Sequence, residues 1–185
     1  PLRAALNQEG SIGQSLLRAE WRVYDSEPFV EFILEVDWRE RQKLLKLVWP
    51  LRLAATSRCD GISGGELFRP LDGREACLRD RTLVSLEDET RLGVVCPEVF
   101  ALDATARRLR FTLLRSAIMS QHDPFRRMVP RGRIADRGCH TFRFRFFAGE
   151  HLQGVALDRQ ALMLQRAPVL ADLTCGMPPL VDEGW

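Results

Sequence analysis

Residues 29–53 have the sequence FVEFILEVDWRERQKLLKLVWPLRL, in which two largely apolar segments flank a polar centre. In the first segment, one side of an extended strand is entirely apolar, and acidic residues occupy most of the other side. This alternation predicts a half-buried strand. Its apolar side consists of Val30, Phe32, Leu34, Val36 and Trp38. Residues 44–49 are apolar on both sides apart from Lys46, which predicts a central strand. We expect the two strands to pair as a hairpin.

Similar alternation predicts further strands along the chain, at residues 20–25, 82–86, 91–96, 108–113 and 142–146. In the last of these, Phe142, Phe144 and Phe146 share one face, which predicts an aromatic core side. Trp21, Trp38 and Trp49 also fall on inward positions and are expected in the core.

Two other segments differ from this pattern. Residues 54–80 contain four glycines and one proline and show little periodicity, which predicts a long functional or interface loop. Residues 150–167 have apolar residues at near-helical spacing, which predicts one amphipathic helix that Pro168 ends.

Several short strings stand out along the same strands. They are DWRERQKLLKL followed by WP within 37–50, GELFRP followed by DGRE within 65–75, GVVC at 93–96, LLRS at 113–116 and ADRGCHTFRF at 135–144. In this order they resemble segments of the C-terminal β-sandwich region of the alpha-mannosidases of glycoside hydrolase family 38.

The resemblance implies an all-β fold, a large antiparallel two-layer sandwich (a supersandwich) of the galactose mutarotase kind. Residues 20–185 would form part of this C-terminal domain, with a minor helix near its end. Residues 1–19 are expected to be a short helix or an arm or linker from a preceding domain.

The resemblance also implies a parent enzyme, a zinc-dependent retaining alpha-mannosidase. Retention of configuration needs a carboxylate nucleophile about 5 Å from an acid/base carboxyl group. In the family, these groups and the zinc ion belong to an N-terminal catalytic barrel. We therefore expect no cofactor in this chain, zinc in the missing catalytic domain, and mannose-containing carbohydrate as the parent's substrate.

Composition excludes several other classes of protein. The chain has 185 residues and is 45% hydrophobic, which suits one domain. Its net charge of +2, with acidic and basic residues interleaved, argues against nucleic-acid binding. No apolar run approaches the roughly 20 residues of a membrane helix, and no secretory signal is present. The basic cluster of Arg126, Arg127, Arg131 and Arg133 is interpreted as a solvated loop.

The five cysteines are scattered and form no C-x-x-C pair, which favours free thiols in a reducing cytoplasm. Pro1 is not an initiator residue, so we expect the sequence to begin inside a longer reading frame or a processed product.

The histidines argue against a metal or catalytic site. His122, His140 and His151 are the only three, and none is spaced i,i+4 with another. Cys139 and His140 are neighbours on a strand and would point to opposite faces, which disfavours a Cys–His nucleophile. We expect neither catalytic residues nor metal ligands in this chain.

Five polar residues remain as candidates for a substrate cleft or a domain interface: Asp136, Arg137, His140, Glu66 and Arg69. An Asp136–His140 contact would fix a loop near the sugar cleft. The favoured alternative is that Asp136 caps a turn and His140 forms a hydrogen bond inside the sandwich. Glu66 and Arg69 are expected to form a structural ion pair.

The leading hypothesis is therefore a domain that frames the substrate cleft, packs on the catalytic domain and is inert alone. One alternative is a free-standing carbohydrate-binding module that uses loops 54–80 and 117–138, with Phe68 and Phe125 as stacking rings. Another is a mutarotase-like epimerase with Glu66 as base and His140 as acid. A homo-oligomer is left open.

Overall fold

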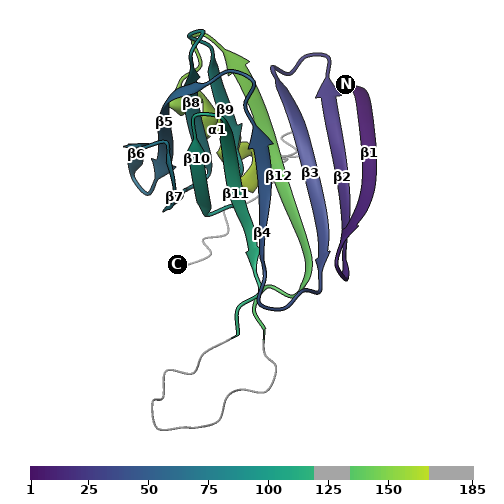
Figure 1. Cartoon of the computed structure of the whole chain (residues 1–185). Coiled ribbons are helices and arrows are strands. Elements are labelled where there is room, and N and C mark those ends of the chain that lie inside the picture. Colours follow the sequence, from purple (N-terminus) through teal and green to yellow (C-terminus); the bar gives the residue numbers. More distant parts are fainter. Residues whose placement is uncertain (119–133, 167–185) are drawn as a thin grey trace, which may run out of the picture.

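The computed structural model describes residues 1–118 and 134–166, which form twelve β-strands and one helix (Figure 1). The elements are β1 (Leu2–Ile12), β2 (Ser15–Tyr24), β3 (Phe29–Trp38), β4 (Leu44–Pro50), β5 (Ala55–Ile62), β6 (Gly65–Arg69), β7 (Asp72–Cys77), β8 (Arg81–Leu86), β9 (Arg91–Val95), β10 (Ala101–Thr105), β11 (Arg108–Arg115), β12 (Gly138–Gly149) and α1 (Gly154–Gln165).

The strands form two antiparallel sheets that pack face to face. One sheet has eight strands in the order β1-β2-β3-β12-β9-β8-β5-β6, and the other has four in the order β4-β11-β10-β7. The expected all-β two-layer sandwich with a minor helix near the C-terminal end is therefore confirmed. No helix within the described ranges is long and apolar enough to cross a membrane.

Strand β3 has the predicted half-buried character. Phe32, Leu34, Val36 and Trp38 are all 5% exposed or less. Val30, expected among them, is 36% exposed. Glu31 is buried instead, and it accepts hydrogen bonds from Tyr24 and Arg145.

The predicted hairpin between β3 and β4 is wrong. β3 lies between β2 and β12 in the larger sheet, whereas β4 pairs with β11 in the smaller one. The chain crosses between the layers over residues 39–43. This crossing is held by backbone hydrogen bonds from Gln42 N to Ser116 O (2.7 Å) and from Ser116 N to Lys43 O (3.0 Å). β4 is therefore an edge strand and not the central strand that its apolar composition predicted.

Residues 1–19 form strand β1 and the first half of β2 rather than a helix. Gly13 (φ 61°) allows the tight turn between the two strands. Every residue of β1 is exposed, because β1 is the edge strand of the larger sheet and lies beyond the smaller sheet (Figure 1). β2 is partly covered, since Trp21 contacts Trp49 of β4 with 5.6 Å between the ring centroids.

The long loop predicted for residues 54–80 is also wrong, since this segment contains β5, β6 and β7. Its lack of apolar periodicity arises from charged residues inside the core. Arg58 and Asp60 are 1% and 0% exposed, and they pair with each other on the inner face of β5. Arg58 Nη2 also donates to the carbonyl oxygen of Leu102 in the opposite sheet, at 3.1 Å.

The other predicted strands are confirmed as β8, β9, β11 and β12, and the predicted aromatic face of β12 is buried. A register shift between Thr112 and Leu114 breaks the simple alternation of β11 and brings Leu114 into the core. The three predicted core tryptophans all pack against the main core, with Trp38 2% exposed. Trp185, Cys175 and the basic cluster lie outside the described residues.

Helix α1 confirms the predicted helix but buries a different face. Leu157, Ala161 and Leu164 pack on Phe29, Val95 and Phe147 on the outer side of the larger sheet. Val155, Leu162 and Met163, which are among the apolar residues whose spacing predicted the helix, are exposed. The helix can approach closely because Gly93 has no side chain: a Cβ there would lie 2.8 Å from Leu157.

Candidate functional site

The Asp136–His140 contact exists, but it involves the backbone. His140 Nε2 lies 2.9 Å from the carbonyl oxygen of Asp136, and the Asp136 carboxylate accepts a hydrogen bond from Arg115 N at 2.8 Å. Asp136 lies in the turn that leads into β12 and has a left-handed backbone conformation, with a φ of 57°. These bonds close a turn and leave no Asp–His carboxylate–imidazole pair.

Arg137 and His140 border different surface hollows. Arg137 borders a hollow with Gly13, Gln14 and Glu40, whereas His140 borders one with Leu16, Asp37 and Cys139. The predicted cluster around the ADRGCH string therefore does not converge on one cavity.

Glu66 does not pair with Arg69. Its carboxylate accepts from Arg81 Nη2 at 2.9 Å, and Arg81 Nε donates to Asp158 of α1 at 2.6 Å. The Arg81 side chain is only 3% exposed, so this ion-pair group ties α1 and the edge strand β6 to β8 within the larger sheet. Arg69 Nε is buried and has no hydrogen-bond partner within the described residues.

Glu66 and His140 are also far apart. β6 and β12 are four strand positions apart in the larger sheet, about 19 Å at the usual spacing of about 4.8 Å. One sugar ring cannot contact both side chains, so the geometry gives the mutarotase-like pairing no support.

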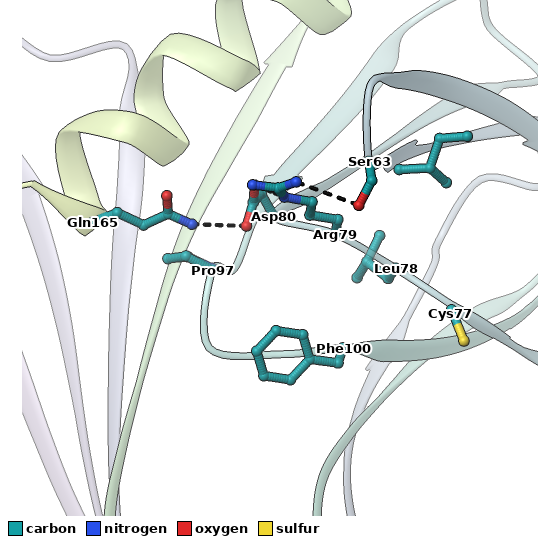
Figure 2. A pocket seen from close by; sticks show the side chains of 9 residues that line it. Ser63, Cys77, Leu78, Arg79, Asp80, Pro97, Phe100 and Gln165 are labelled. Carbon is teal, nitrogen blue, oxygen red and sulfur yellow. Dashed lines mark hydrogen bonds and ion pairs between the residues drawn. The ribbon is translucent and has the colours of Figure 1, made fainter. Parts of the chain in front are cut away.

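The sequence did not indicate a further pocket, which lies where several segments end. It has a volume of about 560 Å³ and is formed by the β5–β6 turn, the segment after β7, the loop after β9 and the end of α1 (Figure 2). Its lining residues are Ile62, Ser63, Cys77, Leu78, Arg79, Asp80, Pro97, Phe100 and Gln165.

Backbone hydrogen bonds fix the frame of this pocket. Arg79 N donates to Gly61 O at 2.9 Å, Leu78 N to Phe100 O at 2.9 Å, and Cys96 N to Asp80 O at 2.8 Å. Asp80 adopts a left-handed conformation with φ 64°, which aspartate tolerates better than most residues. The segment that carries the polar side chains is thus tied to both of its neighbours.

The polar side of the pocket is centred on the Asp80 carboxylate. Gln165 Nε2 donates to Oδ1 at 2.8 Å, and Arg79 Nε donates to Oδ2 at 3.2 Å. Arg79 Nη1 lies 3.4 Å from Ser63 Oγ. In Figure 2 these four residues form a continuous polar rim.

The apolar side of the pocket consists of Leu78, Pro97 and the ring of Phe100. Leu78 is buried, whereas the Phe100 side chain is 69% exposed and lies below the polar rim in Figure 2. Phe100 was not among the predicted site residues, because an isolated aromatic residue between two strands leaves no periodic signal. The location of Gln165 depends on how α1 docks, which no local pattern encodes.

The pocket is not arranged for glycoside hydrolysis, because Asp80 is the one carboxyl group among its lining residues. A retaining glycosidase needs two carboxyl groups, about 5 Å apart. Within residues 1–118 and 134–166, no group of three or more histidine, cysteine, aspartate or glutamate side chains could hold a metal ion.

Fold and pocket together define an antiparallel β-sandwich domain with a partly apolar pocket at the ends of several strands. The chain belongs to the glycosyl hydrolases family 38 C-terminal domain family, whose model matches residues 1–124.

Two solved structures from Enterococcus faecalis share the fold. One is a protein in glycosyl hydrolase family 38, with a TM-score of 0.65 and 13% identity. The other, from strain V583, is an alpha-mannosidase, with a TM-score of 0.63 and 11% identity. Each comparison covers 82% of this chain but only 18% of the solved one. No curated protein sequence matches the chain.

Proposed function

We propose that this chain is the C-terminal β-sandwich of an alpha-mannosidase-like glycoside hydrolase, where it frames the substrate cleft and packs on an N-terminal catalytic domain. The match to the family 38 C-terminal domain supports the glycosidase context. The likeness to a protein described as an alpha-mannosidase suggests mannose-containing carbohydrate as the substrate of the whole enzyme.

The observation that carries this proposal is an uncovered apolar face on β1, β2 and β3. By strand register, Leu6, Val23 and Val30 lie on the side of the larger sheet that elsewhere faces the core. Their exposed fractions are 58%, 38% and 36%. Apolar groups that share an exposed patch mark protein interaction sites more often than isolated ones do. We assign this face to the catalytic domain.

The reacting groups would then belong to that partner domain. It would supply both carboxyl groups and the zinc ion, which would hold sugar hydroxyls during the reaction. This chain would contribute shape and support, and alone it would be inert.

Two further proposals concern the cellular location and the oligomeric state of the protein. The described cysteines Cys59, Cys77, Cys96 and Cys139 are all free thiols, which suits a cytoplasmic location. The uncovered edge of β1 could also pair with a second copy of the chain, so a homo-oligomer stays a secondary proposal.

An activity assay tests the proposal that this chain alone has no glycosidase activity. The chain is incubated with an aryl alpha-mannoside and zinc, and aryl alcohol release is followed against a no-protein control. We expect no release above the control. Turnover that increases in proportion to chain concentration would refute the proposed inertness.

A docking experiment tests the uncovered face. The chain and the catalytic domain of the same gene are co-expressed, and co-elution is measured by size-exclusion chromatography. Leu6→Glu should abolish co-elution because it places a charge inside the interface. Leu16→Glu is the matched control: Leu16 is also 58% exposed but lies on the outer face of β2. Equal loss, or no loss, with both variants would contradict the assignment.

The carbohydrate-binding alternative gains support from one observation. Sequence analysis offered Phe68 and Phe125 as stacking rings. Phe68 is 73% exposed but does not line the pocket, and Phe125 lies outside the described residues. The pocket instead presents Phe100, which sequence analysis did not indicate.

A further inference from the structure

We infer that the pocket bordered by Phe100 binds one pyranose unit of a neutral carbohydrate. The sugar ring would stack on Phe100, while its hydroxyl groups bind Arg79, Asp80 and Gln165. All of these groups belong to the described residues of this chain. It goes beyond the proposed function because it requires neither the catalytic domain nor the uncovered face.

The stacking surface is the first part of the argument. Phe100 is 69% exposed at the border of a pocket whose volume of about 560 Å³ lies within the usual range for small-ligand sites. A pyranose presents a face of C–H groups, which complements the electron-rich face of an aromatic ring. Leu78 and Pro97, which are both largely buried, line the pocket beside the ring.

The polar rim supplies groups that suit hydroxyls. The Asp80 carboxylate accepts one hydrogen bond at each oxygen, from Gln165 and Arg79, although a carboxylate offers about four lone-pair sites. Gln165 uses its Nε2 in that contact, and within the described residues no hydrogen bond occupies its Oε1. The Arg79 side chain is 57% exposed, so its guanidinium can donate to a ligand.

These groups are also pre-organised. Arg79 and Gln165 are each held by Asp80, and the backbone on both sides of Asp80 is tied to neighbouring strands and loops. A ligand that binds this rim therefore has few side chains left to order, which favours affinity.

Charge selects the class of ligand. Arg79 and Asp80 are the only ionised groups among the lining residues, and they neutralise each other. A phosphate or a carboxylate ligand would be attracted by Arg79 but repelled by Asp80 beside it. A neutral polyol with one apolar face fits both the rim and the Phe100 ring.

Calorimetric titration of the full 185-residue chain with methyl alpha-mannopyranoside tests the inference. We expect saturable binding with a millimolar dissociation constant. Phe100→Ala should weaken binding by about tenfold, whereas Phe100→Tyr should retain it because the ring remains. Asp80→Asn should also weaken binding, and asparagine tolerates the left-handed backbone at this position.

Phe68→Ala is the matched control, because Phe68 is 73% exposed but is not among the lining residues of the pocket. It should bind the sugar as the unchanged chain does. Thermal melting of every variant shows whether a loss of binding reflects a loss of fold.

Two results would overturn the inference: no heat of binding at tens of millimolar sugar, or binding that Phe100→Ala leaves unchanged in a folded chain. Loss of binding in Phe68→Ala but not in Phe100→Ala would place the sugar elsewhere and also overturn it. None of these results bears on the activity and docking experiments, so this inference and the proposed function can fail separately.

Discussion

The buried pair of Arg58 and Asp60 provides the sharpest stability prediction. Both side chains are fully buried between the sheets. The Arg58 guanidinium donates twice to Asp60 and once to the Leu102 carbonyl, and its Nη1 has no partner within the described residues. The Asp60 carboxylate also accepts from the Thr82 hydroxyl at 2.7 Å.

Asp60→Ala leaves a buried guanidinium with one of its three hydrogen bonds. Breaking a buried ion pair in this way costs about 3–5 kcal/mol of unfolding free energy. A domain of this size has about 5–15 kcal/mol in total. With an m-value of about 2 kcal/mol/M, the urea midpoint should fall by about 1.5–2.5 M.

Arg58→Met should lower the free energy of unfolding by a similar amount, because the buried Asp60 carboxylate then keeps only the hydrogen bond from the Thr82 hydroxyl. The double variant Arg58→Met/Asp60→Ala removes both charges and leaves only neutral groups unpaired, at about 1–3 kcal/mol. The two changes should therefore couple by several kcal/mol.

Urea unfolding followed by tryptophan fluorescence measures this cycle, because Trp21, Trp38 and Trp49 all pack against the main core. Arg74→Met serves as the control, because the Arg74 side chain is 89% exposed and its loss should leave the midpoint unchanged. Additive costs in the double variant would refute the claim that the pair acts as one buried unit.

Three other predictions follow from the ion pairs and the thiols. Burial alone would raise the pKa of Asp103, but hydrogen bonds from Lys46 and Arg110 hold that pKa below its ordinary value. The ionised Asp103 carboxylate therefore stabilises the fold above about pH 4, and this stabilisation is lost as the pH falls further. In an acid titration followed by unfolding, Lys46→Met should lose less stability than the unchanged chain. Asp158→Ala should lower the free energy of unfolding in urea by about 1–3 kcal/mol, because the buried Arg81 guanidinium then keeps only Glu66 as an ion-pair partner. An unchanged urea midpoint would contradict a stabilising role for the Arg81–Asp158 pair. Burial raises the pKa of the Cys59 and Cys96 thiols, so mass spectrometry of the alkylated native chain should find label at the exposed described cysteines and not at these two. The exposed ones are Cys77 and Cys139.

Periodicity predicted which side of each strand is buried, but it could not predict the partners of the strands. Phe142, Phe144 and Phe146 are buried as their spacing indicated. The pairing of β3 with β12, about 100 residues later in the chain, leaves no local signal. A short apolar strand such as β4 has the same composition whether it is central or at an edge.

Buried charge and isolated aromatics account for the remaining differences. Arg58 and Asp60 interrupt the apolar alternation of β5, so the segment resembled a loop. The ADRGCH string correctly indicated a contact between Asp136 and His140, but this contact stabilises the turn before β12. The pocket depends on Phe100 and Gln165, which lie 65 residues apart and meet only in the folded chain.

The central claim is that this sandwich supports a catalytic domain encoded with it. Sequencing the reading frame upstream of the Pro1 codon tests that claim most directly. The account predicts several hundred codons for a domain that carries a paired-carboxylate and His/Asp zinc pattern. A start codon immediately before Pro1, or an unrelated upstream domain without that pattern, would contradict it.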